Sequence, residues 1–185
     1  MTTPVRAPEA VDAPPAALVR IVRIIDAFSE WTGRLFAWMI IPLMCGTTYE
    51  VVARYLFNAP TIWAYDMSYM LYGSHFMLGA GYTLLKGGHI RTDIFYQNWS
   101  PRRQGAVDAL LYLLFFFPGM IFFFWSGGQE ALHSWQMGER SDASPWRPIV
   151  WPLKMVLPVT ALLILIQGVS EFIKSSYLAL RGRAL

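Results

Sequence analysis

The stretch that decides the fold is ALLYLLFFFPGMIFFFWSGGQ, which occupies residues 109–129 and contains no Asp, Glu, Lys or Arg. Three further windows without a charged residue occupy 35–49, 67–85 and 155–170. A helix that crosses the hydrocarbon core of a bilayer needs about 20 mostly apolar residues. Four such windows predict an all-α integral membrane protein and argue against a soluble enzyme.

The composition agrees with that prediction. Of the 185 residues, 55% are hydrophobic and only 15% are charged, against about 25% charged in soluble domains. The single cysteine, Cys45, excludes an intramolecular disulfide and a CxxC motif, and we expect it to be a small buried hydrophobe. P-loop, GxSxG and HExxH motifs are absent, so no enzymatic activity is predicted.

The windows extend into four predicted spans within a transmembrane domain over 35–173. We expect these transmembrane helices at residues 35–55, 63–85, 105–125 and 150–173. Ser100 and Pro101 suit the N-cap and the first position of the third helix. Proline inside a span removes a backbone hydrogen bond, and neighbouring helices can compensate for that loss in a membrane.

The segments that flank this domain differ in character. Residues 1–17 are rich in Pro and Ala, which predicts a disordered tail. Residues 18–34 place their charges on one helical stripe, which predicts an amphipathic helix lying in the membrane interface. An alternative stays open, in which this segment extends the first span. Residues 174–185 form the predicted C-terminal tail.

The distribution of Lys and Arg predicts the orientation in the membrane. Eleven of these residues fall on the side that carries both termini and the loop between the second and third spans, against four on the other side. Loops rich in positive charge remain on the cytoplasmic side. We therefore expect both termini in the cytoplasm, and we attribute the basic excess to orientation rather than to nucleic-acid binding.

Few ionisable residues fall within the predicted spans. His75 is the only histidine inside one, and either a structural hydrogen bond or a functional role is open for it. Glu50 and Arg54 are spaced i, i+4 at the outer end of the first span, and Asp66 opens the second at similar depth. We expect either a salt-bridge cluster that locks the two spans or a contact site for a partner.

Two further features suit protein contacts. Tyr65, Tyr69 and Tyr72 recur at helical spacing and predict an aromatic packing face. The expected outer loop, roughly 126–148, combines charges of both signs with tryptophan, a composition found in protein recognition as well as in solvated loops. Its predicted docking residues are Glu139, Arg140, Asp142, Trp146 and Arg147.

Several short motifs resemble one family in the same order. RYLFNAP at 54–60 is followed by WAYD at 63–66, GGHIRTD stands at 87–93, and Pro148, Trp151-Pro152 and Pro158 lead into the last span. Together they resemble the small membrane subunit (small permease, DctQ-type) of tripartite ATP-independent periplasmic (TRAP) transporters, over about 45–173. Tyr65 stands where the family has the first residue of an acidic pair. His89 and Asp93 of the third motif join the candidate interface residues.

The resemblance implies a non-catalytic subunit in the bacterial inner membrane, without a cofactor. Its implied partners are a large membrane subunit, which carries the substrate and sodium sites, and a periplasmic solute-binding protein that often captures an organic acid. Two alternatives stay open: a small exporter acting as a dimer, and a quinone-binding membrane anchor of a redox complex. The charge bias opposes the dimeric exporter, because dual insertion needs a weak bias.

Overall fold

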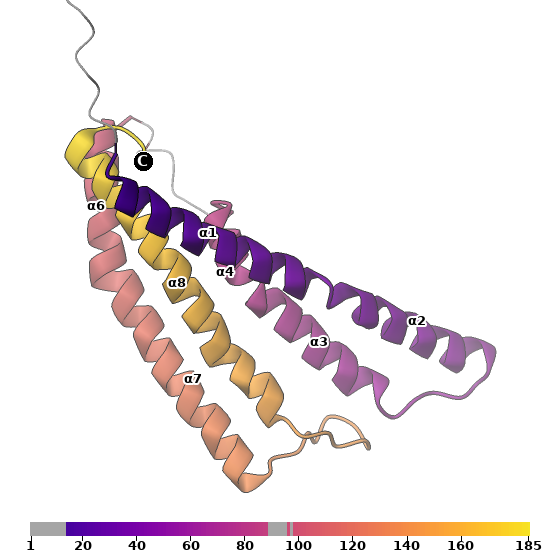
Figure 1. The fold of residues 1–185 in the computed structure, drawn as a ribbon. Helices are drawn as coiled ribbons and strands as arrows, with labels where there is room; N and C mark the ends of the chain where they lie inside the picture. The colour runs from indigo at the N-terminus through magenta and orange to yellow at the C-terminus, as the bar shows by residue number, and fades with distance from the viewer. Residues whose placement is uncertain (1–13, 89–95, 97) are drawn as a thin grey trace, which may run out of the picture.

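The computed structural model describes residues 14–88, 96 and 98–185, and these residues are overwhelmingly helical (Figure 1). The elements in chain order are α1 (Ala16–Ala37), α2 (Ile40–Leu56), α3 (Ala64–Leu78), α4 (Ala80–Leu85), α6 (Pro101–Leu111), the π-helical segment η1 (Tyr112–Phe116), α7 (Phe117–Met137) and α8 (Trp151–Arg181). Helices cover all four predicted spans, and those of the third and fourth run well beyond the predicted ends, to Met137 and Arg181.

The helices form two long antiparallel pairs (Figure 1). One pair runs along α1–α2 and returns along α3–α4, and the other consists of α6–η1–α7 and α8. We call the end where α1 and α6 begin and α8 finishes the inner end, and the opposite end the outer end. The pairs lie together toward the inner end and separate toward the outer end.

Helix α8 is the centre of the fold. It contacts α1, α3, α4, α6 and α7, whereas α2 packs mainly against α3. Small and polar residues make up much of the buried surface of α8 and let the neighbouring helices approach closely. The buried residues of α8 are Pro158, Thr160, Ala161, Leu163, Gln167, Gly168, Ser170 and Tyr177.

Among the described residues, three helical stretches are long and apolar enough to cross a membrane: Ala16–Leu56, Pro101–Met137 and Trp151–Arg181. The remaining predicted span is divided at Gly79 into α3 and α4. Hydrogen bonds continue across the division, because the Gly79 amide donates to the His75 carbonyl at 3.2 Å and the Gly79 carbonyl accepts from Thr83 at 3.0 Å. A transmembrane span over 63–85 therefore stays a prediction, and the nearly continuous helical hydrogen bonding of α3 and α4 supports it.

The predicted interfacial segment lies within α1, which continues almost directly into α2 (Figure 1). Pro42 has no amide hydrogen to donate to Trp38, so the Ile41 amide bonds that carbonyl instead, at 3.1 Å. A short break at residues 38–39 results. Whether α1 lies along the interface or extends the span therefore stays open, as does the cytoplasmic placement of the termini.

Two expectations were wrong. The outer loop was expected over 126–148, but α7 continues to Met137 and Gly138 ends it with a positive φ of 60°. Gly127, Ala131 and Ser134 are buried, so packing stabilises helix where the sequence looked like loop. Cys45 was expected to be buried, but it is exposed on α2, because most of the circumference of that helix has no neighbour within the chain.

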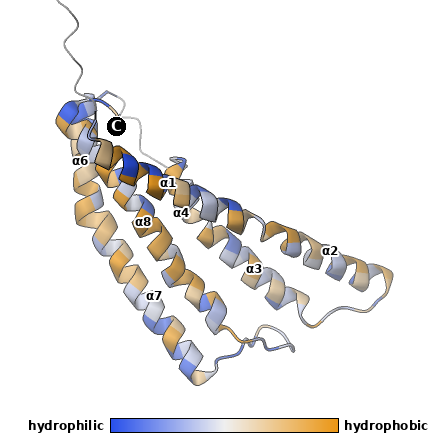
Figure 2. Cartoon of the chain, viewed as in Figure 1, coloured by the Kyte–Doolittle hydropathy of each residue, from blue (hydrophilic) through white to orange (hydrophobic). Residues whose placement is uncertain are grey.

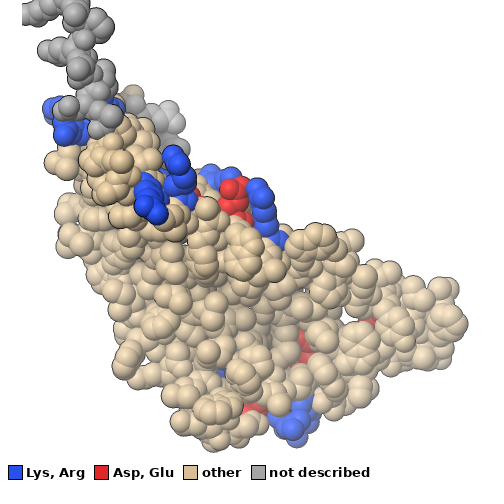
Figure 3. Space-filling model, in the orientation of Figure 1, with Lys and Arg blue, Asp and Glu red and all other residues tan. Residues whose placement is uncertain are grey.

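The surface has the distribution of a membrane protein. The helix shafts are mainly hydrophobic (Figure 2), and Lys and Arg gather at the inner end and at the outer loop with a mostly uncharged surface between them (Figure 3). Many large apolar side chains are exposed, among them Phe122 on α7, at 73%. A bilayer or a partner protein has to cover such a surface, because water would not solvate it favourably.

Candidate functional site

An open groove of about 490 Å³ separates α2 from α3 toward the outer end. Its lining residues are Thr47, Glu50, Val51, Arg54, Thr61, Ala64, Tyr65, Ser68, Tyr69 and Tyr72. Five of the interface residues that the sequence predicted therefore share one surface, to which α2 contributes the ion pair and α3 contributes the tyrosines.

Glu50 holds the outer end of the groove together. Its carboxylate accepts the Arg54 Nε–H at 2.9 Å, a second Arg54 N–H, the Thr61 amide at 3.0 Å and the Thr61 hydroxyl. The Glu50 side chain is only 14% exposed, whereas the Arg54 side chain is 54% exposed. Glu50 therefore ties the connection between α2 and α3, while Arg54 keeps N–H donors on the groove side.

The tyrosines form the exposed wall of the groove. Tyr65, Tyr69 and Tyr72 are 61–66% exposed, and Phe76 extends the same stripe one turn further. The Tyr72 and Phe76 rings stack with centroids 6.5 Å apart. This stripe presents flat apolar faces with hydroxyl groups at their rims, a surface suited to packing against another helix.

Asp66 does not join the Glu50–Arg54 pair. It follows Tyr65 by one residue, which turns it by about 100° around the helix, away from the groove. Asp66 is 1% exposed and accepts hydrogen bonds from Ser141, at 2.6 Å, and from Ser144. These partners are 75 and 78 residues away in the chain, so no local pattern could have identified them.

His75, on α3, contacts the first helix just before the break between α1 and α2. Its Nδ1 lies 3.1 Å from the carbonyl oxygen of Phe36. A carbonyl only accepts, so Nδ1 carries the hydrogen of this bond. The contact fastens α3 to the point where proline interrupts the long first helix, which gives His75 a structural partner.

The connection between α7 and α8 is a compact outer loop over residues 138–150. The amide of Val150 donates to the backbone carbonyl of Glu139 at 3.1 Å, and the amide of Ser141 donates to the carbonyl of Pro148 at 2.9 Å. The two ends of the loop therefore lie together. Arg140, Asp142, Trp146 and Arg147 are exposed as expected of docking residues. Asp142 and Arg147 pair with each other at 2.6 Å.

The Glu139 side chain is 41% exposed, but its carboxylate is engaged in an ion pair at the base of the loop. The Lys154 ammonium lies 2.6 Å from its carboxylate and 2.7 Å from that of Glu130, so the start of α8 is tied to both the loop and α7. The hydrogen bond from Lys154 holds the pKa of Glu139 below its ordinary value. Glu139 therefore stabilises the base of the loop.

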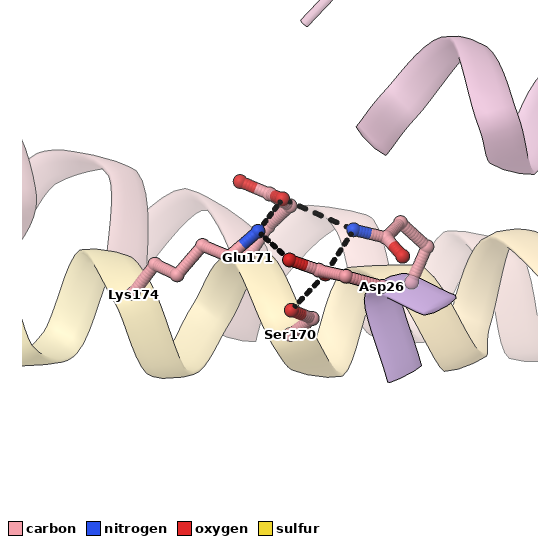
Figure 4. Close-up of polar contacts among 5 residues, drawn as sticks. Asp26, Ser170, Glu171 and Lys174 are labelled. Atoms are coloured by element: carbon pink, nitrogen blue, oxygen red, sulfur yellow. Dashed lines mark hydrogen bonds and ion pairs between the residues drawn. The ribbon is translucent and has the colours of Figure 1, made fainter. Parts of the chain in front are cut away.

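A polar cluster that the sequence did not reveal joins α1 to α8 toward the inner end (Figure 4). Asp26 accepts hydrogen bonds from Ser170 at 2.6 Å and from Gln167 at 3.1 Å, and it pairs with Lys174 at 2.8 Å. Lys174 also contacts Glu171 at 2.8 Å. The sequence placed Asp26 on the charged stripe of residues 18–34, and only the packing of α1 on α8 brings these partners together.

Two predicted interface residues, His89 and Asp93, lie outside the described residues. Within residues 14–88, 96 and 98–185, no group of three or more His, Cys, Asp or Glu side chains could hold a metal ion. The polar residues that the structure brings together instead fasten helices to one another or to the outer loop.

These features define a helical membrane protein with exposed apolar and aromatic surfaces. The chain matches the family model described as tripartite ATP-independent periplasmic transporters, DctQ component, over residues 43–176. It therefore belongs to that family and is a small permease component of a TRAP transporter. No curated protein matches the chain. Membership of a transporter family favours neither the small exporter nor the redox anchor.

Proposed function

We propose that this chain is a non-catalytic scaffold of a sodium-coupled TRAP transporter in the bacterial inner membrane, with both termini in the cytoplasm. It holds the large membrane subunit, and its outer loop helps to dock the periplasmic solute-binding protein during uptake of an organic acid or similar solute. The observation that carries the proposal is the groove between α2 and α3, an exposed aromatic wall beside a cation.

The groove is the proposed contact surface for the large subunit. Its exposed tyrosine rings gain van der Waals packing, and their hydroxyl groups can gain hydrogen bonds, when a partner helix covers them, because packing and interhelical hydrogen bonds drive helix association in a membrane. Arg54 retains N–H donors, and Glu50 is already saturated by Arg54 and Thr61. The groove therefore favours a helix that offers apolar side chains together with a hydrogen-bond acceptor near Arg54.

Affinity purification in mild detergent, followed by mass spectrometry, tests this proposal. We expect the unaltered chain to retain a large multispan protein, and the double variant Tyr69→Ala/Tyr72→Ala to lose most of it. Phe122→Ala is the matched control, because Phe122 is an equally exposed aromatic residue on α7, away from the groove. Equal retention by both variants would contradict the assignment of the groove.

Uptake by reconstituted proteins tests the scaffold role itself. We expect sodium-driven uptake only when the large subunit and the solute-binding protein accompany this chain. The chain by itself has no expected activity, since its described polar residues fasten structural elements together. Sodium-driven uptake by this chain alone would overturn the proposal.

A further inference from the structure

The outer loop owes its shape to a carboxylate on another helix. Asp66, in the first turn of α3, reaches across to Ser141 and Ser144 near the tip of the loop. Each carboxylate oxygen accepts one serine hydroxyl, and Asp66 is buried almost completely beneath these contacts. The negative charge also lies near the N-terminus of α3, where the helix dipole stabilises it.

Each serine passes this constraint on to the loop backbone. The Ser141 hydroxyl oxygen accepts the amide of Ala143 at 3.1 Å, and the Ser144 hydroxyl oxygen accepts the amide of Trp146 at 3.3 Å. A hydroxyl has one hydrogen and two lone pairs. Because the carboxylate takes the hydrogen, the lone pairs are directed toward the loop amides. Two hydrogen-bond relays therefore run from Asp66 to the backbone.

The backbone at the end of these relays is strained. Arg147 has a positive φ of 48°, which a residue with a side chain seldom adopts. Its amide donates to the Ser144 carbonyl at 3.2 Å, and its own carbonyl accepts from Arg140 at 3.2 Å. Such a conformation persists only where its surroundings fix it. Ser144, held by Asp66, is part of what fixes it.

We propose that Asp66 is a positioning residue, which through Ser141 and Ser144 sets the loop conformation that presents Trp146 and Arg147 to a docking protein. The proposal rests on the proposed function of the loop as a docking surface. Asp66 itself is almost completely buried. Its effect on docking passes entirely through the loop backbone.

Hydrogen exchange of the full chain in detergent tests the relays without any partner. In Asp66→Ala we expect the amides of Ala143 and Trp146 to exchange about tenfold faster, the amount that the loss of one hydrogen bond represents. Ser144→Ala should expose the Trp146 amide and leave the Ala143 amide protected. Asp66→Asn keeps one acceptor oxygen, so it should release only one of the two amides.

Two control variants separate the relays from general damage. Gln136→Ala removes an exposed polar side chain from the last turn of α7, next to the loop, and Ser68→Ala removes a hydroxyl from the groove side of α3. Both should leave the exchange of the Ala143 and Trp146 amides unchanged. Unchanged exchange in Asp66→Ala, or equal acceleration in the two controls, would overturn the proposal.

Uptake by the reconstituted transporter, titrated with its own solute-binding protein, tests the consequence for docking. In Asp66→Ala we expect the half-saturating concentration of that protein to rise several-fold, with the maximal rate retained. Trp146→Ala/Arg147→Ala tests the docking surface separately. If that variant leaves the half-saturating concentration unchanged, the docking function fails even where the relays are intact. A lower maximal rate at unchanged half-saturation in Asp66→Ala would contradict the positioning role.

Discussion

Gly105 lies at the closest approach of α6 to α8, and its replacement gives the sharpest test of the fold. A Cβ atom at this position would lie 2.5 Å from the Ala179 nitrogen and 2.6 Å from the Ser175 oxygen. Both are backbone atoms of α8 and cannot rotate away. Because ordinary contacts of this kind are about 3.5 Å or longer, Gly105→Ala forces the two helices apart by about 1 Å.

The expected loss of stability follows from two opposing effects. Overpacking of a close contact costs about 1–3 kcal/mol, and alanine stabilises a helix by up to about 1 kcal/mol relative to glycine. The net free energy of unfolding should fall by up to about 2 kcal/mol, and by about 1–3 kcal/mol relative to a Gly→Ala change that causes no overpacking. For a chain of this size, the difference from such a control corresponds to about 2–12 °C in Tm.

Thermal unfolding in detergent, followed by the fluorescence of the eight tryptophans, measures this change. Gly119→Ala is the matched control, because a Cβ atom at Gly119 would meet no atom within 4 Å. It should be neutral or raise Tm slightly. If Gly105→Ala is as stable as the Gly119→Ala control, the close packing of α6 on α8 is refuted.

Three further predictions concern the polar contacts. Asp26→Asn should lower the free energy of unfolding by about 1–3 kcal/mol, since the charged acceptor of the α1–α8 cluster is lost. Thermal unfolding measures this loss of stability, and an unchanged Tm would contradict the role of the cluster. The pKa of Glu139 is lowered from 4.5, so its stabilising effect is present above that pH and lost as the pH falls through the lower folded value. The protection factors of the amides at the loop base, which are the exchange rates corrected for the intrinsic pH dependence of amide exchange, should therefore fall on acidification below about pH 4.5. Lys154→Gln should remove most of this dependence, and an equally steep fall in the variant would contradict it. His75→Leu should speed amide exchange around the α1–α2 break, because the Phe36 carbonyl loses its partner on α3; unaltered exchange there would count against this contact.

Local patterns in the sequence predicted much of the helical structure and the residues that share one face of α3. The charge-free windows fall on helices because a bilayer requires apolar residues over a fixed length. The tyrosine stripe could be predicted from its spacing of three and four residues, since helical periodicity alone puts Tyr65, Tyr69 and Tyr72 on one face. Glu50 and Arg54 likewise interact at i, i+4, as expected.

Contacts between distant parts of the chain could not be predicted in the same way. Asp66 was grouped with Glu50 by depth, although its rotation around the helix directs it to serines on the outer loop. Asp26 was assigned to the charged stripe of residues 18–34, although Gln167 and Ser170 on α8 donate hydrogen bonds to it. Depth and periodicity give position along and around one helix, but they do not say which helix packs alongside.

The outer loop also helps to fix the position of the α2–α3 hairpin relative to α8. A Cβ atom at Gly73 would lie 3.8 Å from Leu153, so α3 meets α8 partway along its length. The outer loop, which leads into the start of α8, makes a second contact with α3, at Asp66. A helix that contacts its neighbour at two separate points rotates less freely than a helix that contacts it at one. The α2–α3 hairpin is therefore restrained relative to α8, and a force that a partner exerts on the groove is transmitted to α8 through both contacts.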